Sequence, residues 1–171
     1  NPNQIIGVFE KKQSEFNFLD INKKLTIVLE DVRNPGNFGS IIRTVDWFGI
    51  KNIICSKNSV DLYNPKVVQS SMGSLSRISV IYTDLKNLII QLKKEGKYLL
   101  AADTTGEDFY KQEKLSEAII FFGNESKGIC EEIKLGVAKK IKIPNYNDSC
   151  ESLNLSVSVG IIISEILRSK K

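Results

Sequence analysis

Short apolar runs rich in β-branched residues alternate along this chain with longer segments in which apolar residues recur at helical spacing. Apolar runs of about four to eight residues, bounded by polar segments, are typical of strands covered on both faces. The longer segments place residues such as Ile41, Ile42 and Val45 on one side of a helix. The predicted strands are 25–29, 52–55, 78–82, 98–102, 119–122 and 140–143, and the predicted helices are 38–48, 65–71, 85–95, 129–135 and 153–167.

This alternation predicts an α/β domain with a mostly parallel sheet and helices on both faces. Ligands of such sheets bind at the carboxyl ends of the strands, in the loops that lead into the helices. The last predicted helix, 153–167, has almost no polar positions beyond small serines, so we expect it to be buried in a core or against a partner. The apolar run Ile5–Phe9 is interpreted as an extra edge strand or a linker.

Composition narrows the chemistry mainly through what is missing. The 171 residues contain no histidine, which excludes imidazole bases, His-based triads and His-ligated metals. The cysteines Cys55, Cys130 and Cys150 are widely spaced, so we expect reduced thiols and no metal site. A net charge of +4 favours a polyanionic partner only mildly, because lysines in small groups are equally typical of a solvated surface.

The start of the chain bears on its location. No basic segment followed by an apolar stretch opens the sequence, and no apolar run is long enough to cross a bilayer. Because the first residue is Asn1 and not a methionine, we interpret the chain as having lost residues upstream. We expect a cytoplasmic protein, or a piece of one.

Three predicted strand-to-helix loops carry unusual chemistry. In the first, Asn34-Pro35-Gly36 predicts a turn, Asn37 is a predicted cap of the next helix, and Arg43 lies six residues further along. This segment is either a capped helix with a surface arginine or a helix start that binds an anion together with that arginine.

The second loop, which follows strand 119–122, carries Gly123, Glu125 and Gly128. Glycines at these places let the backbone approach a ligand and turn into the next helix. The third loop follows Pro144 and leads to Ser152, a predicted cap of the last helix. Either loop alone would be an ordinary connection.

In this order, the three loops resemble the signature motifs of the SpoU family, also called the TrmH family, of knotted SPOUT methyltransferases. Those motifs have the forms Asn-x-Gly-x-x-x-Arg-Thr, Gly-x-Glu-x-x-Gly, and Ile-Pro followed by Ser-Leu-Asn-x-Ser. The similarity runs from about Leu25 to the end of the chain. The matching positions are Asn37, Gly39, Arg43 and Thr44; Gly123, Glu125 and Gly128; and Ile143, Pro144, Ser152, Leu153, Asn154 and Ser156.

The resemblance implies a homodimeric RNA (ribose-2′-O)-methyltransferase that uses S-adenosylmethionine. It also implies a C-terminal deep trefoil knot, which is a rare exception among folds. The cofactor would lie bent within the knot against the backbone of three loops. The cofactor-binding residues implied in this way are Ala102, Thr104, Gly123, Gly128, Ile143 and Leu153.

The catalytic residues that the resemblance implies are Arg43, Asn37, Glu125, Ser152 and Asn154. The family proposal makes the motif arginine the group that removes the ribose proton. A guanidinium is almost always protonated, so the alternative is that Arg43 binds an RNA phosphate and stabilises the developing alkoxide. We expect Arg43 to be essential in either role and the other four residues to position it, the substrate and the cofactor.

Larger members of the family carry an N-terminal RNA-binding domain. By resemblance, residues 1–20 are interpreted as a linker from such a domain and 21–171 as the catalytic domain. We expect 23S rRNA to be the substrate, with tRNA, or a non-catalytic RNA-binding module of the same fold, as alternatives. The intact Asn37, Arg43, Glu125 and Asn154 argue against the module. Gln69 stands where some relatives have a basic residue, which weakens phosphate contact there.

Overall fold

The computed structural model describes residues 7–8, 10–11, 25–112, 117–147 and 149–168. Strands and helices alternate through most of this part of the chain, as predicted. The elements are β1 (Thr26–Leu29), α1 (Pro35–Trp47), β2 (Asn52–Ser56), α2 (Pro65–Ser70), η2 (Ser74–Ser76), β3 (Ser79–Thr83), α3 (Leu85–Lys94), β4 (Leu99–Asp108), η3 (Phe109–Lys111), β5 (Ile119–Phe122), α4 (Glu131–Gly136), β6 (Lys139–Lys142) and α5 (Leu155–Arg168).

The six strands form one sheet in the order β3-β2-β1-β5-β4-β6, and every neighbouring pair is parallel. The predicted mostly parallel α/β sheet is therefore confirmed. From β1 the chain first runs outward through β2 to β3, and it later adds β5 to the other edge of β1. The strand order thus reverses between β1 and β5, and such a switch point is where ligands bind in open parallel sheets.

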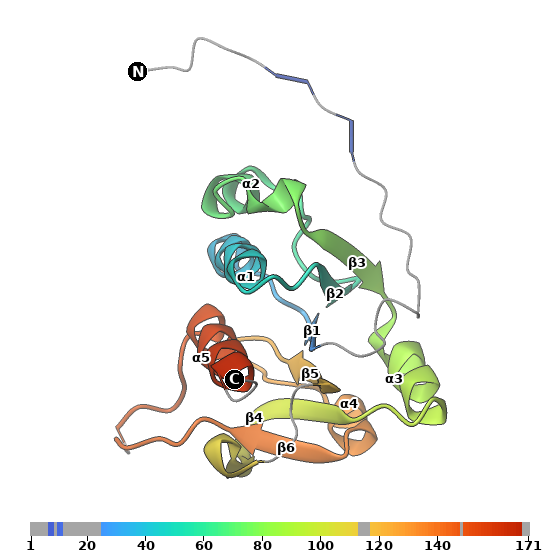
Figure 1. Ribbon diagram of the computed structural model, residues 1–171, viewed down its shortest axis with the longest axis vertical. Helices are drawn as coiled ribbons and strands as arrows, with labels where there is room; N and C mark the ends of the chain where they lie inside the picture. Colours follow the sequence, from blue (N-terminus) through green and yellow to red (C-terminus); the bar gives the residue numbers. More distant parts are fainter. Residues whose placement is uncertain (1–6, 9, 12–24, 113–116, 148, 169–171) are drawn as a thin grey trace.

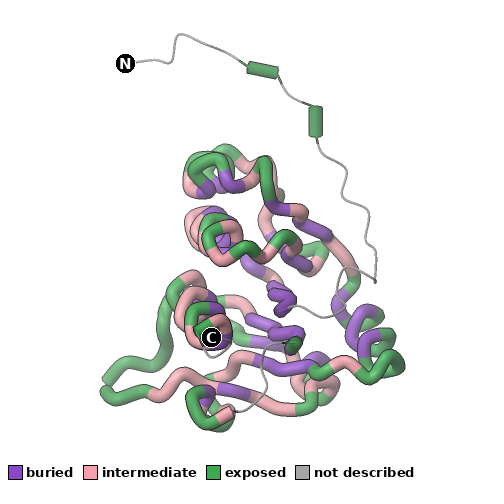
Figure 2. Tube along the Cα trace, viewed as in Figure 1, coloured by how far each residue is buried: buried purple, intermediate pink, exposed green. Residues whose placement is uncertain are grey.

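Helices cover both faces of the sheet (Figure 1). Strand side chains alternate between two buried clusters, so that Ile27 and Leu29 pack towards α1 and α5, whereas Val28 packs towards α3 and α4. Figure 2 shows the burial concentrated in the strands and in the helix sides that face them. The α2 helix packs against α1 rather than across the sheet (Figure 1).

The α1 helix begins earlier than predicted. Asn34 is its N-cap, and its Oδ1 accepts hydrogen bonds from the backbone N–H groups of Gly36 and Asn37 at 2.9 and 3.1 Å. The prediction that Asn37 caps this helix is wrong. Pro35 does not start a separate turn, because its fixed φ suits the first position of a helix.

The α5 helix begins later than predicted. Asn154 caps it by accepting from the N–H of Ser156 at 2.9 Å, so the predicted cap at Ser152 is wrong. Serine and asparagine are comparable caps, and nothing local chooses between two candidates that lie two residues apart. One side of α5 is buried in the core, but Val157 on its other side stays 48% exposed in the single chain.

The β4 strand runs beyond its predicted end through an irregularity beside β6. Both Ala102 and Glu107 pair with Ile141, so the residues between them loop out from the ladder. Gly106 permits this close approach, since a Cβ there would lie 2.6 Å from the backbone nitrogen of Ile141. Thr104 lies in this irregular part of β4, at the carboxyl edge of the sheet.

Three expectations stay predictions. The fold agrees with a SPOUT-type domain, but the trefoil knot itself remains to be tested. Ile5, Ile6 and Phe9 lie outside the described residues, as does most of the predicted linker 1–20. In the described part of the chain, no helix combines the length and apolar character needed to span a membrane.

Candidate active site

The loops that carry the predicted site leave the sheet from neighbouring strand ends. At the carboxyl edge, Leu29 of β1 pairs with Phe122 of β5, Phe122 pairs with Ala102 of β4, and Ala102 pairs with Ile141 of β6. The segments that follow these residues contain Asn37, Gly123, Thr104 and Ile143 respectively. The fold therefore gathers the predicted loops at one edge, across the switch point between β1 and β5.

Three predicted catalytic residues form a continuous chain of hydrogen bonds. The Asn154 amide Nδ2 donates to Oδ1 of Asn37 at 3.0 Å, and Nδ2 of Asn37 donates to Oε1 of Glu125 at 2.8 Å. The partners are 117 and 88 residues apart in sequence. All three motifs therefore meet at one place.

The donors and acceptors in this chain are fixed by the start of α5. Oδ1 of Asn154 accepts the backbone N–H groups that cap the helix and also the Ser156 hydroxyl at 2.7 Å. Only the amide nitrogen of Asn154 then remains to face Asn37, which must present its oxygen. As a result, Asn37 turns its own nitrogen to Glu125, which accepts as a carboxylate.

Arg43 does not join this chain of hydrogen bonds. Six residues along an α-helix amount to about 9 Å of rise and about 120° of rotation from Asn37, so the two side chains leave α1 on different sides. Arg43 is exposed, and its guanidinium has no hydrogen bond or ion pair among the described residues. It is therefore free to meet an anion from outside the chain.

Ser152 is likewise not brought into the cluster. It is exposed, and its carbonyl oxygen accepts a weak contact from the Cys150 thiol at 3.5 Å. The segment between β6 and α5, which contains Ser152 and Leu153, extends away from the sheet (Figure 1), whereas Ile143 at its start packs against the core. The catalytic role of Ser152 stays a prediction.

Residues 24–164 match the model of the SpoU rRNA Methylase family. The chain belongs to this family of RNA methyltransferases. An uncharacterized tRNA/rRNA methyltransferase of Borreliella burgdorferi is 31% identical over 166 residues, covering 96% of this chain and 68% of that protein. The 23S rRNA (guanosine-2′-O-)-methyltransferase RlmB of Neisseria meningitidis is 25% identical, covering 97% of this chain and 69% of that protein.

Solved SpoU and TrmH structures share the fold. A TrmH-family structure from Porphyromonas gingivalis superimposes with a TM-score of 0.81 at 34% identity, covering 86% of this chain. The AdoMet-bound rRNA methyltransferase of Sinorhizobium meliloti gives a TM-score of 0.79 at 28% identity over 85% of this chain. This chain spans only 60% and 56% of those two chains, which is less than two thirds of either.

The residues present suit the cofactor bound by the Sinorhizobium relative. The predicted contacts Ala102, Ile143 and Leu153 are apolar, and Thr104 is neutral, which matches an adenosine held by backbone groups and apolar surface. Gly128 has a φ of +68°, a conformation that lets its loop turn back tightly at this edge. Ala102, Thr104, Gly128 and Ile143 would hold the nucleoside, and the Glu125 carboxylate would face the positively charged methionine end of the cofactor. Leu153 is 47% exposed in the segment that extends from the sheet, and its contact with the cofactor stays a prediction.

The irregular part of β4 that carries Thr104 is held in place by Asp103. The carboxylate of Asp103 accepts from the backbone and hydroxyl of Thr105 at 2.8 and 2.7 Å, and it pairs with Lys134 of α4 at 3.3 Å. Burial raises the pKa of Asp103, but the hydrogen bonds from Thr105 and the charge of Lys134 outweigh it, and the pKa is lowered. Asp103 therefore stays ionised and holds Thr104 in place at neutral pH.

Two features at the same edge were missed at the sequence level. Asp31 has a φ of +49°, which L residues rarely adopt, and Asn124 bridges the loops after β1 and β5. Asparagine after a strand end signals a turn, but not a partner 93 residues away.

A separate pocket of about 320 Å³, lined by Lys57, Ser59, Asp61 and Tyr82, contains no predicted site residue. Among the described residues, no cluster of three or more acidic or cysteine side chains is placed to hold a metal.

Proposed function

We propose that this protein methylates a ribose 2′-hydroxyl in structured RNA with S-adenosylmethionine as the methyl donor. The observation that carries the proposal is the Asn154–Asn37–Glu125 chain of hydrogen bonds, which unites the three family motifs at the carboxyl edge of the sheet. The Neisseria relative, named as a guanosine-2′-O-methyltransferase, supports the ribose oxygen as acceptor.

The proposed chemistry divides the work between cofactor and protein. When bound, S-adenosylmethionine supplies an electrophilic methyl group on a positively charged sulfur. The protein must hold the ribose oxygen in line with that group and stabilise the negative charge that develops on this oxygen as the hydroxyl proton passes to solvent water. Arg43 is the exposed cation for this task, since none of the described residues pairs with it. Its guanidinium binds a phosphate of the RNA and stabilises the alkoxide, and Glu125 is held in place by Asn37.

A homodimer is part of the proposal. Trp47 at the end of α1 is 85% exposed, Val157 in the first turn of α5 is 48% exposed, and Leu153 just before α5 is 47% exposed. The two helices pack together, with Gly160 facing Thr44 (Figure 1). A second copy that covers this apolar surface would place Arg43, one turn before Trp47, inside or beside the interface.

The substrate we propose is rRNA, and tRNA is the alternative. The relatives from Neisseria meningitidis and Bacillus subtilis are both named as 23S rRNA methyltransferases. The alternative is favoured by a solved structure concerned with 2′-OH methylation of C/U34 on tRNA. That chain aligns over 97% of its length with a TM-score of 0.78 at 25% identity. We also propose a cytoplasmic location, where both RNAs are found.

Methyl incorporation tests the substrate. The protein is incubated with S-adenosylmethionine labelled in the methyl group and either deproteinised 23S rRNA or bulk tRNA. We expect label in the rRNA, and a loss on the order of 100-fold or more with Arg43→Ala if the guanidinium acts in the transition state. Label in tRNA alone would overturn the choice of rRNA, and no label in any RNA would favour a non-catalytic RNA-binding module.

Calorimetric titration separates cofactor binding from transfer. We expect S-adenosylhomocysteine to bind the wild type and Arg43→Ala with affinities that agree within about threefold, because Arg43 acts on the RNA in this account. Loss of binding in Arg43→Ala would instead assign the guanidinium to the cofactor site. Absence of binding to a folded wild type would contradict the proposed methyl donor.

A further inference from the structure

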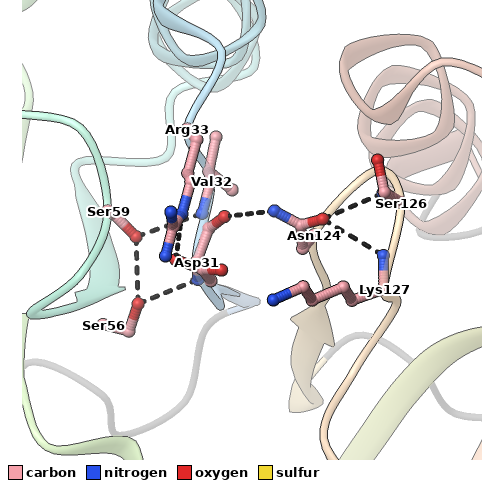
Figure 3. A network of polar contacts seen from close by, with 8 residues as sticks. All are labelled: Asp31, Val32, Arg33, Ser56, Ser59, Asn124, Ser126 and Lys127. Carbon is pink, nitrogen blue, oxygen red and sulfur yellow. Dashed lines mark hydrogen bonds and ion pairs between the residues drawn. The ribbon is translucent and has the colours of Figure 1, made fainter.

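Asn124 lies between the predicted site residues Gly123 and Glu125, and its side chain links two loops (Figure 3). Its Oδ1 accepts from the backbone N–H groups of Ser126 and Lys127 at 2.9 and 3.1 Å, which shapes the loop after β5. Its Nδ2 donates to the carbonyl oxygen of Asp31 at 2.8 Å, across the switch point between β1 and β5. The half-buried Asn124 therefore connects the loop that bears Glu125 with the loop that leads to Asn37.

The Asp31 turn is held from its other side by two hydroxyls, one at the end of β2 and one just after it. Ser56 Oγ accepts from the Asp31 N–H at 2.8 Å, Ser59 Oγ accepts from the Val32 N–H at 3.3 Å, and the two hydroxyls lie 3.1 Å apart (Figure 3). Because Asp31 has a φ of +49°, its turn needs such support to persist. The turn is a fixed point against which Asn124 can set the Glu125 loop.

The bond between Asn37 and Glu125 cannot set this geometry by itself. Glu125 is exposed, so water competes for its carboxylate and lowers the net contribution of the bond. The backbone of Asn124 also pairs with Gly128 in both directions, at 3.0 and 2.9 Å, which makes the loop a compact unit. Two hydrogen bonds anchor this loop beside the end of β1: Asn124 Nδ2 to the Asp31 carbonyl, and the Cys130 N–H to the Glu30 carboxylate at 2.8 Å. Of the two, only the Asn124 bond lies next to Glu125, so it is the one that sets the position of that side chain.

We infer that Asn124 is a positioning residue for methyl transfer, which fixes the Glu125 loop against the Asp31 turn and so presents Glu125 to Asn37. This inference rests on the proposed function for its kinetic consequence and on the hydrogen bonds alone for its structural one. Only an amide fits the position, because one atom must accept two N–H groups while another donates to a carbonyl.

The sharpest variant is Asn124→Asp. It keeps the oxygen that accepts from Ser126 and Lys127, but it replaces the donor with an oxygen that faces the Asp31 carbonyl. Asn124→Ala removes both functions. Ser126→Ala is the matched control, since only the backbone of Ser126 takes part in the network.

Nuclear magnetic resonance gives a readout that needs no activity. In Asn124→Asp we expect the Ser126 and Lys127 amides to stay protected from hydrogen exchange, while the Asn37 side-chain amide exchanges faster than in the wild type. In Asn124→Ala all of these groups should exchange faster, and in Ser126→Ala none should. An unchanged Asn37 side chain in Asn124→Asp would overturn the inference.

Kinetics provides the second readout. We expect Asn124→Asp to lower kcat on the order of 10- to 100-fold while the KM for RNA stays within about threefold, as for a misplaced catalytic loop. Ser126→Ala should match the wild type. A wild-type kcat in Asn124→Asp would also overturn the inference. An inactive wild type would instead refute the proposed function, and the exchange measurements would still decide whether Asn124 sets the loop.

Discussion

Asn154 serves two elements at once. Its oxygen caps α5, and its nitrogen begins the chain of hydrogen bonds that runs through Asn37 to Glu125. The helix cap therefore sets the direction of every bond in this chain of hydrogen bonds.

The sequence predicted these residues as a group through family motifs, but neither spacing nor helical periodicity shows that residues 37, 125 and 154 touch. Local patterns also proposed the wrong caps, because Asn34 and Asn154 compete with neighbours of equal capping strength.

The donor and acceptor order of the Asn154–Asn37–Glu125 hydrogen bonds can be tested by reversing it. Asn154→Asp keeps the cap but loses the donor to Asn37, and a flip of Asn37 would then turn its oxygen towards the Glu125 carboxylate. Glu125→Gln alone should cost little, because its Oε1 can still accept from Nδ2 of Asn37, and its amide nitrogen becomes useful only when Asn37 is flipped. We expect the double variant to restore all bonds with Asn37 flipped, so that its melting temperature exceeds the value expected from the two single changes.

Scanning calorimetry of the wild type, both single variants and the double variant completes the cycle. Additive losses would contradict a directed chain. Asn154→Ala removes the cap and the donor to Asn37 together, so we expect it to cost more than Asn154→Asp, which keeps the cap, by about 1 kcal/mol of unfolding free energy.

The ion pair between Asp46 and Arg77 gives a pH dependence. Arg77 Nε and Nη2 donate to Asp46 Oδ2 at 2.8 and 2.6 Å, and these bonds lower the pKa of Asp46 despite some desolvation. The stabilisation is therefore fully present above about pH 4, the pKa of an unfolded aspartate, and is lost as pH falls through the lower folded value.

We expect the difference in melting temperature between the wild type and Asp46→Asn to shrink as the pH is lowered from about 6 to about 2. Thermal melts at several pH values measure it. If the difference in melting temperature between the two proteins stays constant over this pH interval, the charge of Asp46 does not stabilise the fold.

At the scale of elements, a glycine sets how closely α2 approaches α1. A Cβ on Gly39 would lie 1.9 Å from Oγ of Ser70 and 2.8 Å from the carbonyl oxygen of Val67.

Strand and helix positions were predictable because buried strands and one-sided helices leave strong patterns. The looped irregularity of β4 beside Ile141 was not, since it depends on a neighbouring strand that is remote in sequence.

Gly39→Ala should push the two helices apart and cost about 1–3 kcal/mol of unfolding free energy. The matched control is Gly160→Ala in α5, where a Cβ would meet Thr44 at an ordinary 3.8 Å. We expect the control to be neutral or stabilising by up to about 1 kcal/mol, as for other glycines inside helices. Chemical denaturation measures both, and equal effects would contradict the described packing.

At the scale of the whole molecule, the exposed apolar side chains of α1 and α5 give the proposed homodimer a location. The buried face of α5 was predictable from its apolar sequence, whereas the exposure of Val157 follows from which side meets the sheet. Burying Trp47 and Val157 in a second copy would remove two large apolar groups from water.

We expect Val157→Lys to convert a dimer into a monomer in analytical ultracentrifugation, with the α/β fold retained by circular dichroism. Ile90→Lys is the control, because Ile90 is 52% exposed on α3, on the opposite face of the sheet. A dimer that survives Val157→Lys but not Ile90→Lys would place the interface on α3.

Product analysis tests the central claim most directly. RNA treated with the protein and S-adenosylmethionine is digested to nucleosides, and the methylated species are identified by mass spectrometry. We expect a nucleoside whose methyl group lies on the ribose, formed by the wild type and by Ser126→Ala but not by Arg43→Ala. A methyl group on a base, or an equal yield from Arg43→Ala, would contradict the account of how this site works.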